Sequence, residues 1–216
     1  MHKHYEAFIP IIETENREAV LNFVLSKFSN NELDILTLYT EVLTPSLNSM
    51  AAKENDKAFI WREHVRSSII RTLIENCYPY VIKERNEKYK IKTNKSVAVV
   101  CPSEEYHEIG ARMITDFFTL LGYNATFVGS NTPKDEFLDA LSIINLDYIA
   151  VSVSNPYSLV TAKKTIEKLK ESDLKVKILA GGSAFSHNKN SYKDIGADMY
   201  LNYFEDIRKL AEEDKV

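Results

Sequence analysis

Hydrophobic positions follow two different spacings along the chain. Up to about residue 92, apolar residues recur every three or four positions, which is the spacing of amphipathic helices. From Lys95 onward, short apolar runs rich in β-branched residues alternate with segments of helical spacing. This alternation predicts a parallel sheet with helices between its strands. We therefore predict an all-α helical domain over residues 1–92, followed by a doubly wound α/β domain over residues 93–216.

Polar and proline positions divide the helical part into a predicted bundle of four or five helices. The polar run 29–31 separates the first two apolar stripes, and Pro45 either kinks or restarts the second helix. Pro79 is expected to interrupt the third helix near its end. The charged run 83–88 and the polar pair 93–94 are expected to form the linker to the α/β domain.

Five strands are expected in the α/β domain, near 96–101, 124–128, 147–152, 175–180 and 198–201. Helices are expected near 107–122, 133–144, 158–171 and 203–213, with a short helix near 188–194. Parallel strands all end at the same edge of a sheet, so residues that follow different strands meet there. That edge is where ligands bind in open α/β sheets.

A polar motif, Glu105-Tyr106-His107-Glu108-Ile109-Gly110, follows the first predicted strand and opens the first helix of the α/β domain. His107 is therefore expected on a loop at the carboxyl end of a strand. An imidazole at this place could ligate a metal, act as a base, or cap the helix. The motif by itself leaves these alternatives open.

Two further features follow the third and fourth predicted strands at fixed distances. Ser152-Val153-Ser154 comes after 41 residues, 111–151, and Gly181-Gly182 comes after a further 26 residues, 155–180. The combined motifs and spacings resemble those of the cobalamin-binding domain family, over roughly residues 95–214. Ser154 departs from the family pattern, which has Leu or Val at that position.

The resemblance implies a Rossmann-like, flavodoxin-like fold and a cobalamin cofactor, either adenosylcobalamin or methylcobalamin. It implies that His107 is the lower cobalt ligand. Glu105 would accept a hydrogen bond from the other ring nitrogen, as carboxylates do beside many metal-bound histidines.

Five small residues complete the cofactor site that the resemblance implies. Gly110 would let the helix approach the nucleotide tail of the cofactor, and Ser152 would hydrogen-bond the displaced base. Ser154 would belong to the pocket wall, and Gly181 and Gly182 would line the channel for the tail. Taken singly, the glycines are better explained as turn residues and Ser152 as a strand-end residue. The joint spacing of the motifs is what favours the cofactor site.

Helical domains precede such sheet domains in two classes of relatives. In corrinoid proteins of methyl transfer, that domain carries Met-x-x-Val-Gly-x-x-Phe and a later Leu-Pro, and residues 33–60 contain no match. Light- and cobalamin-sensing transcription regulators carry a Trp, then Glu-His, then a Ser. Glu63, His64 and Ser67 resemble the second pattern, and Glu63 and His64 would face the upper ligand. The alternative for Glu63 and His64 is a solvated helix face.

The resemblance to the regulators has one gap. Lys53 stands at the position of their Trp, and the only tryptophan, Trp61, lies two residues before Glu63. Residues two apart on a helix face different sides. We therefore expect Trp61 to pack in the core rather than to replace the missing residue.

The leading hypothesis is a cytoplasmic cobalamin-binding sensor that is not an enzyme. Loss of an upper ligand by light or exchange would alter an oligomer or a partner interface. The regulators begin with a helix-turn-helix domain that this sequence lacks, so a partner protein would have to contact DNA. The first alternative is a corrinoid protein that shuttles methyl groups in a cobalamin-dependent methyltransferase system. The second is a nucleotide-binding or purely structural flavodoxin-like domain.

Composition adds three limits to these hypotheses. The 216 residues carry a net charge of −4, which argues against direct nucleic-acid binding. No apolar run approaches the length of a membrane span, and no signal peptide is evident. Cys77 and Cys101 form no metal motif, so free thiols and a cytoplasmic location are expected. Cys101 is expected to be a small buried filler beside the site.

Overall fold

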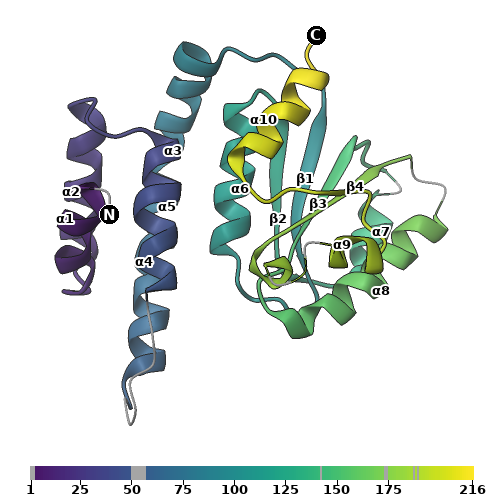
Figure 1. Cartoon of the computed structure of the whole chain (residues 1–216), viewed down its shortest axis with the longest axis horizontal. Helices are drawn as coiled ribbons and strands as arrows, with labels where there is room; N and C mark the ends of the chain where they lie inside the picture. The colour runs from purple at the N-terminus through teal and green to yellow at the C-terminus, as the bar shows by residue number, and fades with distance from the viewer. Residues whose placement is uncertain (1–2, 50–56, 142, 173–174, 187, 189) are drawn as a thin grey trace. The chain divides into compact units, whose positions relative to one another are not determined.

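The computed structural model describes residues 3–49, 57–141, 143–172, 175–186, 188 and 190–216 (Figure 1). The chain divides into two compact units, Met1–Glu87 and Lys88–Val216. The first strand of the second unit begins at Ser96. The predicted boundary at 92–93 therefore falls between the division of the units and this strand. Lys53 lies outside the described residues.

The first unit is helical wherever its elements are described. Its elements are α1 (Lys3–Ile12), α2 (Arg17–Ser29), α3 (Ile35–Thr37), the π-helical η1 (Leu38–Leu43), α4 (Thr44–Asn48) and α5 (Phe59–Glu84), followed at the division of the units by the π-helical η2 (Arg85–Tyr89). Residues four apart lie on one face of a helix, and α2 accordingly buries Val20, Val24 and Phe28. Pro45 lies in the first turn of α4, where a missing N–H costs little. It therefore restarts the helix rather than ending it.

The expected interruption at Pro79 is wrong, because α5 continues through it to Glu84. Contacts of the residues after the proline hold the last turns of the helix in place. Val81 is fully buried, and the ring of Tyr80 stacks on that of Phe28 with their centroids 4.5 Å apart. At the end of the helix, Glu84 Oε1 accepts the backbone N–H of Ile35 at 2.9 Å. The first part of the predicted linker is therefore helix.

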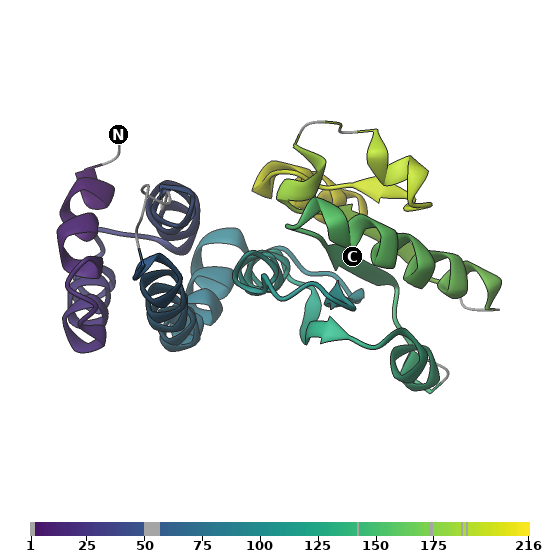
Figure 2. The same ribbon diagram turned by 90° about the horizontal axis from the view of Figure 1, so that it is seen from below.

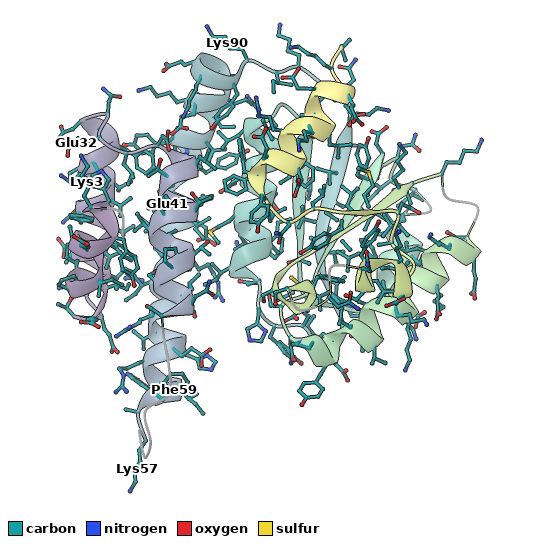
Figure 3. The ribbon with its side chains drawn as sticks, viewed as in Figure 1. Lys3, Glu32, Glu41, Lys57, Phe59 and Lys90 are labelled. Carbon is teal, nitrogen blue, oxygen red and sulfur yellow. The ribbon has the colours of Figure 1, made fainter. Side chains whose placement is uncertain are left out.

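The expectation that Trp61 packs in the core is also wrong, because its side chain is 69% exposed. The reason is the length of α5, whose 26 residues span about 39 Å, whereas the 13 residues of α2 span about 20 Å. Buried residues of α5 begin only at Ile69. The first turns of α5, near the labelled Phe59 and Lys57, extend beyond the other helices of this unit (Figure 3).

The second unit contains the predicted five-stranded parallel sheet, which confirms the fold class. Its strands are β1 (Ser96–Pro102), β2 (Asn124–Thr132), β3 (Tyr148–Ser152), β4 (Lys177–Gly181) and β5 (Met199–Tyr200), in the order β2-β1-β3-β4-β5. All four pairings of neighbouring strands are parallel. Six of the seven residues of β1, Val97–Pro102, are buried, as expected for an internal strand of a sheet covered on both faces.

Helices cover both faces of the sheet. They are α6 (Ile109–Leu120), α7 (Lys134–Leu141), α8 (Leu159–Glu171), α9 (Ser191–Asp194) and α10 (Phe204–Glu213), with single 3-10 turns η3 (Pro156–Ser158) and η4 (Ser183–Phe185). Figure 2 shows α6 and α10 on one face and α7 and α8 on the other. Helix α6 begins at Ile109, two residues later than predicted, so His107 precedes the helix. Among the described residues, no helix combines the length and apolarity needed to cross a membrane.

Candidate functional site

The structure brings the loops after β1, β3 and β4 to one edge of the sheet. Ser152 at the end of β3 pairs with Gly181 at the end of β4. The backbone N–H of Val153 donates to the Gly181 carbonyl at 2.9 Å. The Ser154 carbonyl accepts the Ser183 hydroxyl at 3.2 Å. The loop after β1 joins this group through Glu105.

Glu105 is fully buried, and both of its carboxylate oxygens accept hydrogen bonds. Oε1 accepts the backbone N–H of His107 at 2.9 Å and lies 2.6 Å from Nδ1 of the same residue. Oε2 accepts the backbone N–H groups of Ser154 at 2.9 Å and Asn155 at 2.8 Å. One side chain therefore connects the loop after β1 to the loop after β3.

These contacts determine the charge of the Glu105 carboxyl. Burial by itself would raise its pKa, because a charged group is costly away from water. Hydrogen bonds from Asn155 N–H, from His107 N–H and ring, and from Ser154 N–H act in the opposite direction and hold the pKa of Glu105 below its usual value. Glu105 is therefore an anion at neutral pH.

The His107 ring is oriented by this anion and is otherwise accessible. Because the carboxylate can only accept, the Nδ1 atom that faces it carries the proton. The lone pair of the ring then lies on Nε2, which has no hydrogen-bond partner in the described part of the chain. The side chain is 61% exposed. Many metal-bound histidines share this arrangement of carboxylate and imidazole.

His107 is the one protein ligand that this loop offers to a metal ion. Among the described residues, no group of three or more His, Cys, Asp or Glu side chains is arranged to hold a metal ion. A single imidazole is sufficient when the metal already carries its other ligands, as cobalt does in a corrin ring. The chemistry of His107 therefore fits a metal-bearing cofactor better than a bare ion.

Gly110 and Ser152 also fit a ligand at this edge. A Cβ atom on Gly110 would meet no protein atom within 4 Å, so packing inside the protein does not require glycine there. Ser152 is 8% exposed, and its hydroxyl makes no hydrogen bond to the described residues. The hydroxyl oxygen itself is not fully buried, so it is available to hydrogen-bond a bound ligand.

Gly181 and Gly182 have structural explanations within the protein. A Cβ atom on Gly181 would lie 2.7 Å from the Leu201 carbonyl oxygen. Gly182 has φ of +110°, and a Cβ atom there would lie 2.2 Å from the Val153 carbonyl oxygen. The close packing of these strand ends therefore requires both glycines, whether or not they also line a channel.

Cys101 is buried at the end of β1, and its Sγ lies 3.8 Å from the carbonyl oxygen of His107. Burial, together with the nearby carboxylates of Glu105 and Glu108, raises the pKa of its thiol to about 12. The thiol therefore stays protonated at neutral pH and is not a nucleophile. This environment is that of a buried filler.

Sequence reasoning missed two asparagines that shape the loops of the site. Asn131, with φ of +50°, accepts the Glu104 N–H through Oδ1 at 2.8 Å and donates its own N–H to the Glu105 carbonyl at 2.8 Å. Asn155 accepts the Tyr157 N–H at 3.1 Å and so starts η3. The Asn-Pro pair at 155–156 and the tolerance of asparagine for left-handed backbone were the available signals.

Comparison with known proteins identifies the family. Residues 95–211 match the B12 binding domain. The chain belongs to the B12 binding domain family. It is 30% identical over 112 residues to the dimethylamine corrinoid protein of Methanosarcina barkeri, and 28% identical over 109 residues to a corrinoid protein of Desulfitobacterium hafniense. Each match covers 50% of this chain, and the chain spans about half the length of these two relatives, 51% and 50%.

Solved structures of B12-related proteins share the fold. The chain superposes on the monomethylamine corrinoid protein of Methanosarcina barkeri with a TM-score of 0.79, over 97% of both chains, at 16% sequence identity. It also resembles a chain of the methanol:cobalamin methyltransferase complex of the same organism, with a TM-score of 0.51, over 95% of this chain and 77% of that chain, at 17% identity.

These findings correct the leading hypothesis from the sequence. The prediction of a light-responsive sensor and transcription regulator is wrong, because the matched relatives are corrinoid proteins. The cofactor roles of Glu63 and His64 rested on the regulator class alone and are not carried forward. Both residues lie on α5 in the first unit, Glu63 half-buried and His64 exposed. The sensor hypothesis gave weight to the absence of the methyl-transfer motif from residues 33–60, whereas the fold is shared with a monomethylamine corrinoid protein at 16% identity.

Proposed function

We propose that this chain is the corrinoid protein of a cobalamin-dependent methyltransferase system. In this role it carries a methyl group between partner proteins and is not an enzyme on its own. The observation that carries the proposal is the family match over residues 95–211, together with relatives that are named as dimethylamine corrinoid proteins. The shared fold with the monomethylamine corrinoid protein agrees with it.

The second domain, 93–216, would bind the cofactor through the residues at the edge of the sheet. A bound cobalamin supplies a cobalt centre that accepts and donates a methyl group. His107 would ligate this cobalt through Nε2, while Glu105 orients the ring and keeps the proton on Nδ1. The Ser152 hydroxyl would hydrogen-bond the displaced base, and Gly110 would leave space for the tail. Ser154, Gly181 and Gly182 would complete the wall.

Methyl transfer implies particular partners and a particular form of the cofactor. We propose methylcobalamin as the loaded form, and methyltransferases of methylamine or methanol type as protein partners. A cytoplasmic location suits such a carrier, and free Cys77 and Cys101 are the usual state of cysteines in that compartment.

The proposal is tested by loading the purified protein with methylcobalamin in the dark and separating free cofactor by gel filtration. A methyltransferase that transfers methyl groups from corrinoid proteins to a thiol is then added together with that thiol, and loss of the methyl group is followed by visible absorption. We expect about one cofactor per chain and demethylation that depends on the added enzyme. A protein that binds the cofactor but is demethylated no faster with any such enzyme would contradict the carrier function.

A further inference from the structure

Two residues with left-handed backbone are hydrogen-bonded to each other close to His107. Glu104, in the loop after β1, has φ of +68°, and Asn131, near the end of β2, has φ of +50°. The side-chain Oδ1 of Asn131 accepts the backbone N–H of Glu104 at 2.8 Å, and the Asn131 N–H donates to the Glu105 carbonyl at 2.8 Å. Asparagine tolerates left-handed backbone, whereas glutamate rarely adopts it. The strained conformation of Glu104 therefore needs a contact that holds it, and Asn131 supplies this contact.

An irregularity in the pairing of β1 and β2 includes Asn131. Val100 of β1 pairs with Gly129 of β2, and Pro102 pairs with Thr132. One residue of β1 therefore lies opposite two residues of β2, which is the arrangement of a β-bulge. A bulge turns side chains away from their regular direction, and bulges are frequent next to functional sites. The bulge accounts for an asparagine side chain that reaches the loop after the neighbouring strand.

The end of β2 makes two further contacts with the segment between β1 and α6. The Ser103 hydroxyl donates to the Thr132 carbonyl at 3.1 Å. The Ser130 hydroxyl donates to Glu108 Oε2 at 3.0 Å. Both bonds come from hydroxyl groups, which rotate to suit their acceptors and leave the backbone free to adjust. The bond to Asn131 differs, because its donor is the backbone of the loop itself.

We propose that Asn131 is a positioning residue for His107. By accepting the Glu104 N–H, it keeps Glu104 in the left-handed conformation and so sets the direction in which the chain leaves β1 toward the imidazole. Without this acceptor, Glu104 would relax to a negative φ, and the loop would populate geometries in which the imidazole is displaced. The conformation of the loop is a property of the protein without cofactor. Its effect on cobalt ligation rests on the proposed function.

The loop conformation is tested by NMR of the cofactor-free protein, in which backbone coupling constants give the φ of Glu104. Wild type should show a positive φ. Asn131→Gly removes the acceptor, while glycine still permits a positive φ at position 131. In this variant, Glu104 should shift to a negative φ, and its amide should exchange about fivefold faster because one hydrogen bond is lost. Asn131→Asp keeps the acceptor and should keep the wild-type values. A negative φ at Glu104 in wild type, or an unchanged φ in Asn131→Gly, would overturn the proposal.

Titration with hydroxocobalamin tests the consequence for the site. Asn131→Gly should bind about fivefold more weakly than wild type, because only a fraction of its molecules hold the competent loop geometry. Glu104→Gly removes the strain at its source, since glycine adopts a positive φ readily. Adding Glu104→Gly to Asn131→Gly should therefore restore most of the lost affinity, whereas a general loss of stability would not be restored. A double variant that binds no better than Asn131→Gly would contradict the proposal.

Asn16→Gly is a matched control, because Asn16 Oδ1 also accepts one backbone N–H, that of Ala19 at 3.0 Å, at the start of α2. It should change neither the φ of Glu104 nor the cobalamin affinity, and an affinity loss as large as that of Asn131→Gly would overturn the proposal. If wild type binds no cobalamin, the proposed function fails, and the φ of Glu104 still decides the role of Asn131. If cobalamin binds equally to wild type and Asn131→Gly, the positioning role fails and the proposed function stands.

Discussion

Gly182 lies so close to Val153 that a Cβ atom on the glycine would be 2.2 Å from the valine carbonyl oxygen. This contact, together with φ of +110° at Gly182, means that the protein itself requires glycine at this position. Gly110 differs, since a Cβ atom there meets no protein atom within 4 Å. The packing of the protein therefore requires glycine at position 182 but not at position 110.

Alanine substitutions at Gly110 and Gly182 should separate a role in cofactor binding from a role in the stability of the protein. Gly110→Ala should leave the free energy of unfolding of the cofactor-free protein unchanged or raise it by up to about 1 kcal/mol, because alanine favours helix. It should nevertheless weaken cobalamin binding. Gly182→Ala should lower the free energy of unfolding by about 1–3 kcal/mol through backbone strain. Urea unfolding and cobalamin titration measure both effects. A large loss of stability in Gly110→Ala would contradict the account.

Cys101 should be unreactive in the folded protein. With its pKa raised to about 12, its thiolate fraction at pH 8 is about one in ten thousand. A disulfide reagent at pH 8 should therefore label it more than about a thousandfold more slowly than in urea, as followed by mass spectrometry of the labelled peptide. Rapid labelling of native protein at Cys101 would show that the loop opens readily.

Trp61, the only tryptophan, provides a direct optical test of the described exposure. Its emission maximum should lie close to that of tryptophan in water, and acrylamide should quench it efficiently. Trp61→Ala should change the free energy of unfolding by less than about 0.5 kcal/mol, as expected for an exposed side chain. A blue-shifted emission that shifts to the red only on unfolding would contradict this exposure.

Asp147 connects the first ends of β1 and β3, and its contacts predict a pH dependence. Burial would raise its pKa, but the Ser96 N–H, Lys95 and the Ser96 hydroxyl hold the pKa below the usual 3.8. Because the pKa of Asp147 is lowered in the folded state, Asp147 stabilises the fold fully at pH values above 3.8. This stabilisation is lost as the pH falls through the pKa of the folded state.

Asp147→Asn tests this sign. The variant should unfold with a free energy about 1 kcal/mol lower than wild type at pH 7, because it loses charge-assisted hydrogen bonds. The difference should shrink as the pH falls below 3.8. Urea unfolding at pH 7 and pH 3 gives both values. A difference that grows toward acid pH would refute the assignment.

The sheet domain could be predicted because its signals are local. The apolar run at 97–101, the polar loop from Glu105 to Gly110 and the strand-end serines and glycines each identify one strand or its end. The rule that parallel strands end at one edge then brings these features together. The hydrogen bond between Glu105 and His107 was implied by the family resemblance, and the structure contains it.

The errors concern features that depend on distant contacts. Pro79 does not end α5, because contacts with Phe28 and Ile35 hold the last turns of the helix. These two residues lie far away in sequence. Trp61 is exposed because α5 is longer than its partner helices. The second set of Glu105 contacts, to Ser154 and Asn155, could not be read from residues about fifty positions apart. The functional class was misassigned because Glu63 and His64 form only a short motif.

The measurement that tests the central claim most directly is the EPR spectrum of the cobalt(II) form bound to protein labelled with 15N-histidine. If Nε2 of His107 is the lower ligand, the label changes the nitrogen hyperfine splitting of the cobalt signal. His107→Ala should remove this effect and weaken binding by at least about tenfold, as expected for loss of a metal ligand. A splitting that the label leaves unchanged, in wild type and in His107→Ala alike, would contradict ligation by His107.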